Sequence, residues 1–167
     1  SNVTLKEYLQ MIRKKTARII SAACEIGALV GSGTQKQIAA LRSFGEHLGM
    51  AFQIKDDLLD ITGDVEDLGK AIGSDVIEKK KTFLLLTALE RARGNDKRFL
   101  KASQNVRQRV DVHRVRKIYE RTGVLDIAEA NIERRTRSAQ RSLASLPASR
   151  AQQILLWLSG KLLNRNQ

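Results

Sequence analysis

Apolar residues recur at helical spacing along most of the chain, and the apolar/polar alternation typical of strands is missing. The sequences Thr-x-x-Glu from Thr4 and Thr-x-x-Gln from Thr34 predict capping boxes at the starts of two helices, the first running to about Val30 and the second long. Residues 62–81 are expected to form a loop. Further helices are predicted from Thr82 to Gly94, over 98–121, over 124–145 and from Pro147 onward. The pattern therefore predicts an all-α helical bundle.

The length of 167 residues suits one helical domain, so we expect a single domain over residues 1–167. Gly45 and Gly49 lie four residues apart on the long predicted helix and predict the close approach of a neighbouring helix. The single cysteine, Cys24, supplies no disulfide framework. No apolar run is long enough for a transmembrane segment, and the cytoplasm is the expected compartment.

Three aspartates, Asp56, Asp57 and Asp60, lie close together on the long predicted helix. Each residue advances about 100° around a helix, so Asp56 and Asp60 share one face and Asp57 lies one position around, on the side of Asp60. Two carboxylates roughly 4 Å apart repel each other by about 1 kcal/mol in water and by more in a partly buried site. The cluster therefore requires a counter-charge. Mg²⁺ suits it, because this ion takes one or two carboxylates, several waters and substrate phosphate.

A solvated helix face is the alternative interpretation of an Asp-rich stretch. Against it, apolar residues such as Phe44, Leu48 and Leu59 surround the aspartates at helical spacing, which places the carboxylates beside a core-facing surface. An EF-hand is excluded because its alternating acidic loop and final Glu are absent. Lysines follow the aspartates at Lys70 and Lys80. The segment therefore predicts a place that holds divalent metal and phosphate together.

From Tyr8 onward, the order and spacing of several short motifs resemble the polyprenyl synthetase family of trans-isoprenyl diphosphate synthases, which includes farnesyl and geranylgeranyl diphosphate synthases. The motifs are Lys15-Thr16, Phe52-Gln53, Asp56-Asp57-Leu58-Leu59-Asp60, Thr62-Gly63-Asp64, Gly69-Lys70, and Gly73-Ser74-Asp75 followed by Glu78, Lys80 and Thr82. The resemblance covers the C-terminal half of such an enzyme. It implies a helical bundle that is the C-terminal half of an isoprenoid-synthase-type fold.

The resemblance implies a Mg²⁺-dependent prenyltransferase that condenses an allylic diphosphate with isopentenyl diphosphate to make a longer trans-polyprenyl diphosphate. It implies Asp56, Asp57 and Asp60 as the metal ligands. The substrate contacts that it implies are Lys15, Thr16, Phe52, Gln53, Lys70 and Lys80, of which Lys15, Thr16, Gln53 and Lys70 are the expected catalytic residues. Metal and ammonium groups fit this reaction because ionising the allylic carbon–oxygen bond releases a diphosphate with several negative charges.

The chain departs from the family pattern in two ways. The Glu-Gly-Lys that the family places before its last lysine reads Glu78-Lys79-Lys80, so Lys80 is aligned in preference to Lys79 and Lys81, and Leu84 replaces a common proline. No segment matches the other aspartate-rich helix of the family. We therefore expect the chain to hold half of the metal site and to be inactive alone. A homodimer is the family expectation for the complete enzyme.

Charge is distributed unevenly: residues 1–90 contain 12 basic and 12 acidic side chains, and residues 91–167 contain 18 and 6. This basic half supports a rival hypothesis, a non-catalytic helical subunit or a polyanion-binding protein. Aromatic residues that stack on bases are few, and no nucleic-acid-binding signature is present, so we expect no nucleic-acid partner. Terpene cyclases are a third possibility, although their usual Asn-Ser/Thr-Glu metal motif is absent.

Overall fold

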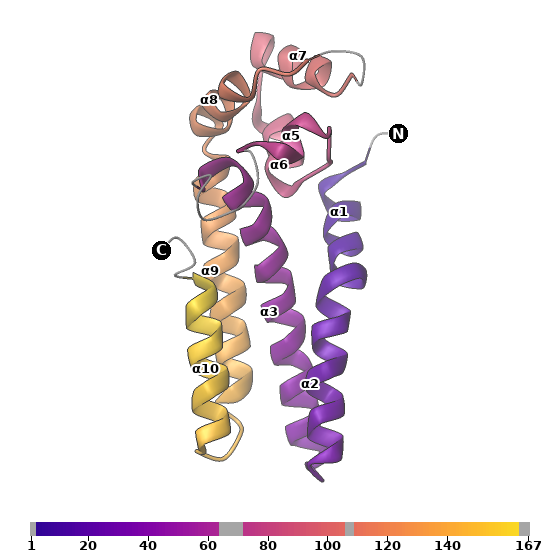
Figure 1. Ribbon diagram of the computed structural model, residues 1–167, viewed down its shortest axis with the longest axis vertical. Coiled ribbons are helices and arrows are strands. Elements are labelled where there is room, and N and C mark those ends of the chain that lie inside the picture. The colour runs from indigo at the N-terminus through magenta and orange to yellow at the C-terminus, as the bar shows by residue number, and fades with distance from the viewer. Residues whose placement is uncertain (1–2, 64–71, 106–108, 164–167) are drawn as a thin grey trace. The chain divides into compact units, whose positions relative to one another are not determined.

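The computed structural model describes residues 3–63, 72–105 and 109–163, and every regular element in these ranges is a helix (Figure 1). The all-α prediction is confirmed. The elements are α1 (Leu5–Ile12), a π-helical turn (Arg13–Ala17), α2 (Arg18–Val30), α3 (Gln35–Thr62), α5 (Ser74–Ile77), α6 (Phe83–Arg91), α7 (Gly94–Ser103), α8 (Val112–Thr122), α9 (Val124–Leu143) and α10 (Arg150–Leu163). In the described part of the chain, no helix combines the length and apolarity needed to cross a bilayer.

The chain divides into two compact units. Residues 1–8 and 56–129 form the first unit, and residues 9–55 and 130–167 form the second. The single domain expected over residues 1–167 stays a prediction.

Both predicted capping boxes are present. The Thr4 N–H donates to Glu7 Oε2 at 2.8 Å, and the Glu7 N–H donates to Thr4 Oγ1 at 3.2 Å. The Thr34 N–H donates to Gln37 Oε1 at 2.8 Å, and the Gln37 N–H donates to Thr34 Oγ1 at 3.3 Å. These reciprocal bonds satisfy donors that a helix start leaves free, and they begin α1 and α3 where the sequence predicted. The first predicted helix does reach Val30, although the π-helical turn interrupts it.

The single helix predicted over 98–121 is wrong, because this stretch holds most of α7 and nearly all of α8. The Asp111 side chain accepts the Arg114 N–H at 3.0 Å and begins α8, and Gly123 ends it in the left-handed conformation at φ 66°. Gly94, predicted as a stop, is the first residue of α7. The helix cap at Asp111 therefore starts a new helix, although the apolar residues of 98–121 follow one continuous helical period.

Two smaller corrections concern segments predicted as loop and helix. The loop predicted over 62–81 contains the short helix α5. The last helix begins at Arg150 rather than at Pro147, because Ser149 Oγ accepts the Gln152 N–H at 3.2 Å and caps it there.

In the second unit, α2, α3, α9 and α10 lie side by side as a helical bundle (Figure 1). Buried Phe44, Ile132 and Leu143 belong to its core. The Ser142 Oγ donates to Ser43 Oγ at 3.0 Å and links α9 to α3. The helices that carry Thr16 and Gln53 are thus held by packing along their length.

Gly45 and Gly49 allow α3 to approach the segment before it closely, as the sequence predicted. A Cβ added at Gly45 would lie 2.7 Å from the Cα of Ser21, and one at Gly49 would lie 2.6 Å from the Cα of Ala17. Both neighbours are backbone atoms, which cannot swing aside as the end of a side chain can.

In the first unit, α6 packs against α7 and α8, and α5 packs against α8. Leu84, Leu100 and Ile118 are fully buried in this unit. Gly73, at φ 75°, precedes α5, and a Cβ there would lie 2.3 Å from Val112 Cγ1. Glycine at this position therefore lets the start of α5 sit against α8.

We predict that Gly49→Ala destabilises the protein by about 1–3 kcal/mol, because the added methyl overpacks a helix contact. Gly27→Ala is the matched control, since Gly27 is exposed on α2 and nothing lies within 4 Å of an added Cβ there. This change should stabilise the protein by roughly 0.5–1 kcal/mol. Urea unfolding of the two variants measures both effects, and equal changes in the free energy of unfolding would contradict the close contact.

Candidate active site

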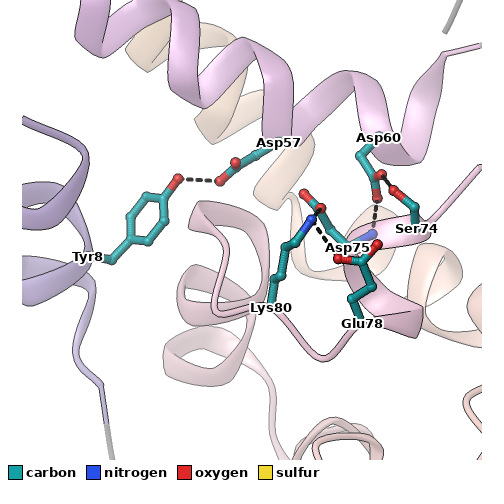
Figure 2. Close-up of polar contacts among 7 residues, drawn as sticks. All are labelled: Tyr8, Asp57, Asp60, Ser74, Asp75, Glu78 and Lys80. Atoms are coloured by element: carbon teal, nitrogen blue, oxygen red, sulfur yellow. Dashed lines mark hydrogen bonds and ion pairs between the residues drawn. The ribbon is translucent and has the colours of Figure 1, made fainter. Parts of the chain in front are cut away.

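Asp57 is a buried carboxylate that joins three helices of the first unit. It lies on α3 with 5% of its surface exposed. Its Oδ2 accepts the Tyr8 hydroxyl of α1 at 2.5 Å (Figure 2). The same oxygen accepts the N–H of Phe83, the first residue of α6, at 2.8 Å. A helix N-terminus favours negative charge. Burial and the neighbouring Asp57 charge raise the pKa of Tyr8, so its hydroxyl stays a donor.

Asp60 is half-buried and ties the end of α3 to the start of α5. Its Oδ1 accepts the Ser74 hydroxyl at 2.5 Å, and its Oδ2 accepts the Asp75 N–H at 3.1 Å (Figure 2). Burial raises the pKa of Asp60, the Ser74 hydrogen bond opposes that rise, and the Asp75 charge adds to it. Negative charge on Asp60 is therefore costly here, which favours a cation nearby.

Lys80 lies beside this acidic group. Its Nζ is 2.7 Å from Asp75 Oδ1 and 2.8 Å from Glu78 Oε2, and about half of its side chain is exposed (Figure 2). These two hydrogen bonds raise the pKa of Lys80. Lys81 differs, because its Nζ donates to Gln104 Oε1 at 2.7 Å and burial lowers its pKa. Of these two lysines, Lys80 is the one that lies in the acidic cluster.

Asp56 is half-buried, and it forms no hydrogen bond or ion pair within the described part of the chain. It shares a face of α3 with Asp60, one turn further along. Over residues 3–63, 72–105 and 109–163, no three His, Cys, Asp or Glu side chains converge as a protein-only metal cage requires. The donors are all oxygens, and Mg²⁺ needs only one or two carboxylates beside water and phosphate. The residues present therefore fit Mg²⁺, with Asp56 and Asp60 as its carboxylates.

In the second unit, the predicted substrate contacts Thr16 and Gln53 meet. The Thr16 hydroxyl donates to Gln53 Oε1 at 3.0 Å. Lys15 and Thr16 lie in the π-helical turn over Arg13–Ala17, a feature that often marks functional positions in helices. Lys15 is exposed, and Phe52 is 36% exposed. The hydrogen bond holds the end of the Gln53 side chain beside Thr16.

The remaining predicted site residue, Lys70, lies outside the described residues, as does Asp64 of the motif after α3. The residues that sequence reasoning missed are Tyr8 and Ser74, which orient two of the three aspartates. A tyrosine on the apolar face of a helix predicts a buried hydrogen bond, because a buried hydroxyl needs a partner. Which partner it finds is not visible in the sequence.

Comparison with known proteins places this site in a family. The model of the polyprenyl synthetase family matches residues 1–122. This match extends over more than half of the chain and includes the aspartates of α3 together with Ser74, Asp75 and Lys80. The chain belongs to the polyprenyl synthetase family.

Individual relatives agree with this assignment. The chain is 40% identical, over 98% of its length, to a short chain isoprenyl diphosphate synthase of Methanothermobacter thermautotrophicus, of which it covers 50%. It is 36% identical, over 96% of its length, to an all-trans-nonaprenyl-diphosphate synthase of Rhodobacter capsulatus, of which it covers 49%. The chain thus spans about half the length of the curated relatives it matches.

A solved structure gives the same result for the fold. A polyprenyl synthase from Caulobacter crescentus, complexed with calcium and isoprenyl diphosphate, matches 99% of this chain with a TM-score of 0.91 and 32% identity. The chain covers 51% of that structure. The helical arrangement is therefore that of half an isoprenyl diphosphate synthase.

We predict that Tyr8→Phe destabilises the protein by about 1–3 kcal/mol, because the buried Asp57 carboxylate loses a donor. A double-mutant cycle with Asp57→Ala isolates the interaction, since the cycle cancels the separate cost of each truncation. Urea unfolding of the four proteins measures the coupling energy. A coupling energy near zero would show that the hydrogen bond does not hold α1 to α3.

Proposed function

We propose that this chain carries the second aspartate-rich half of the active site of a trans-isoprenyl diphosphate synthase. The reaction is Mg²⁺-dependent condensation of an allylic diphosphate with isopentenyl diphosphate. The observation that carries the proposal is the cluster of Asp60, Ser74, Asp75 and Lys80 beside a free-standing Asp56, in a member of the polyprenyl synthetase family. The calcium and isoprenyl diphosphate held by the Caulobacter crescentus structure support the substrate class.

Two of the three aspartates bind the metal, and the third positions the helix that carries them. Asp56 and Asp60 hold Mg²⁺, and Asp57 holds α3 in the orientation that turns these two toward the ion. This assignment revises the three-ligand set, because Asp57 is buried and both of its described donors come from other helices. When bound, Mg²⁺ supplies positive charge against the charge that develops on the leaving diphosphate.

Lysines bind the diphosphate directly. Lys80 leaves its ion pairs with Asp75 and Glu78 to contact the diphosphate oxygens, a small change for a half-exposed flexible side chain. Lys15, exposed on the π-helical turn, is assigned to diphosphate binding on the resemblance to the family. Lys70 is assigned to the same role on the resemblance alone.

Thr16 and Gln53 stabilise the allylic cation through oxygen dipoles. The Thr16 hydroxyl holds Gln53 Oε1 in place, so that no reorganisation is needed as charge develops. Phe52 borders the apolar part of the substrate. The carbon–oxygen bond breaks with its electron pair on the diphosphate, and the double bond of isopentenyl diphosphate attacks the allylic cation to form the new carbon–carbon bond. A proton then passes to an oxygen of the released diphosphate, and its C–H electron pair forms the new double bond.

We propose that the chain binds metal and diphosphate but does not turn over alone, since it spans about half of its relatives. A homodimer of the complete enzyme and a cytoplasmic location are part of the same proposal. The rival function, polyanion binding without catalysis, rests on the 18 basic and 6 acidic side chains of residues 91–167. The two functions differ in whether diphosphate binding needs metal.

We predict that Asp56→Asn lowers the Mg²⁺-dependent affinity for inorganic diphosphate about tenfold or more, because a direct carboxylate ligand is lost. The matched control is Asp126→Asn, which makes the same change of charge at an exposed position of α9 and should leave the affinity unchanged. Calorimetric titration with and without a chelator measures both. If the affinity for diphosphate changes neither when metal is removed nor in the Asp56→Asn variant, the result would support polyanion binding instead.

We predict that Lys80→Gln lowers the same affinity by about tenfold, because a charge-assisted contact to diphosphate is lost. Lys81→Gln should have little effect, since Lys81 is hydrogen-bonded to Gln104. The same titration compares the two variants. Equal losses would indicate that net charge alone, rather than the position of Lys80, determines binding.

A further inference from the structure

The outer face of α10 is apolar and exposed. Ile154, Trp157 and Leu158 are 53%, 61% and 46% exposed, and their spacing places them on one side of the helix. Lys161 continues the same side one turn later, with its Nζ 5.6 Å from the centre of the Trp157 ring. Arg150 lies one turn before Ile154 and is also exposed. This face is therefore an apolar patch with a basic residue at each end, called here the outer α10 face.

The opposite side of α10 packs on α9 and mixes polar with apolar residues, because Leu155 and Leu156 lie on it together with Gln152 and Ser159. Gln152 Nε2 donates to the carbonyl oxygens of Leu143 at 2.9 Å and Leu146 at 3.2 Å. The fully buried Ser159 accepts Gln140 Nε2 at 3.1 Å. An ordinary surface helix turns its apolar stripe to the core and its polar residues to water. In α10, apolar residues lie on both sides, and the outer face leaves Ile154, Trp157 and Leu158 exposed, so it offers a surface for an apolar partner.

The charge around the outer α10 face indicates which kind of partner this face binds. The outer α10 face carries Arg150 and Lys161, and α10 contains no acidic residue. A second copy of the chain is disfavoured, because a two-fold contact between these faces brings the basic ends of one helix against those of the other, whether the helices run parallel or antiparallel. The neighbouring α9 exposes more positive charge at Arg134 and Arg141, whereas its Arg137 is ion-paired with Glu133. The partner should therefore combine apolar material with negative charge.

An anionic bilayer surface combines both. A helix with Trp and aliphatic residues on one face lies in the plane of the membrane interface, with that face at the boundary between headgroups and acyl chains. Tryptophan suits this boundary because one part of the ring is apolar and the N–H is polar. Basic side chains at the edge of the face bind lipid phosphates, each adding attraction to an anionic surface.

We propose that the outer α10 face binds the surface of membranes that contain anionic phospholipids. Ile154, Trp157 and Leu158 enter the headgroup region, and Arg150 and Lys161 contact phosphates. The inference rests on α10 and its packing against α9, and it does not depend on the proposed prenyl transfer.

The experiment uses Trp157 itself, because it is the one tryptophan in the sequence. Fluorescence of the protein is recorded with vesicles of phosphatidylcholine, alone or mixed with phosphatidylglycerol. The expected result is a blue shift and protection from iodide quenching with the mixed vesicles, both weakened by salt. Vesicles of phosphatidylcholine alone should produce little change.

Variants that retain Trp157 test whether the outer α10 face is the part of the protein that binds the membrane. Ile154→Gln with Leu158→Gln should lower partitioning into mixed vesicles about tenfold, and Arg150→Gln with Lys161→Gln should lower it by a similar factor. The matched control is Ile19→Gln with Ile26→Gln on α2, whose side chains are 67% and 58% exposed. It should leave partitioning unchanged. Circular dichroism checks that each variant retains its helices.

Four results would overturn the proposal. Sedimentation with vesicles without a change at Trp157 would mean adsorption through another basic surface. A blue shift that grows with protein concentration in the absence of lipid would mean that a second copy covers the face. A tryptophan already shielded from iodide in lipid-free, monomeric protein would mean that another part of the protein covers it. An equal loss in the α2 control would mean unspecific apolar binding.

Discussion

The first unit depends on one buried carboxylate. Asp57 accepts hydrogen bonds from Tyr8 on α1 and from the first N–H of α6, so a single side chain links three helices. A buried charge without such donors would be costly, and the helix N-terminus adds a favourable field. This requirement sets the rotation of α3 at its C-terminal end. The orientation of Asp56 and Asp60 follows from it, because both sit on the same rigid helix.

Neighbouring aspartates thus acquire different chemistry from different surroundings. Asp57 accepts hydrogen bonds from Tyr8 and the Phe83 N–H, whereas Asp60 is held by Ser74 and the Asp75 N–H while burial still raises its pKa. Lys80 provides positive charge next to this group. Carboxylates beside a lysine provide ligands both for a cation and for an anion, the combination on which the proposed metal-assisted diphosphate chemistry depends.

In the second unit, close helix packing rather than a buried charge positions the π-helical turn and α10. The close contact of Gly49 with Ala17 fixes α3 against the segment whose π-helical turn carries Lys15 and Thr16. The same unit contains α10, whose Gln152 and Ser159 form hydrogen bonds with the α9 segment and whose Ile154, Trp157 and Leu158 are exposed. Both features show how helix contacts decide which side chains remain available for ligands or partners.

Much of this protein was readable from local sequence alone. The capping boxes at Thr4 and Thr34, the close approach at Gly45 and Gly49 and the all-α class each depend on residues a few positions apart, or on the absence of a side chain. The surroundings of each aspartate could not be predicted from local sequence. Tyr8 and Asp57 are 49 residues apart, and Phe83 is 26 residues from Asp57. Only folding brings such partners together, so only the tertiary structure decided which aspartate turns inward and which face of α10 turns outward.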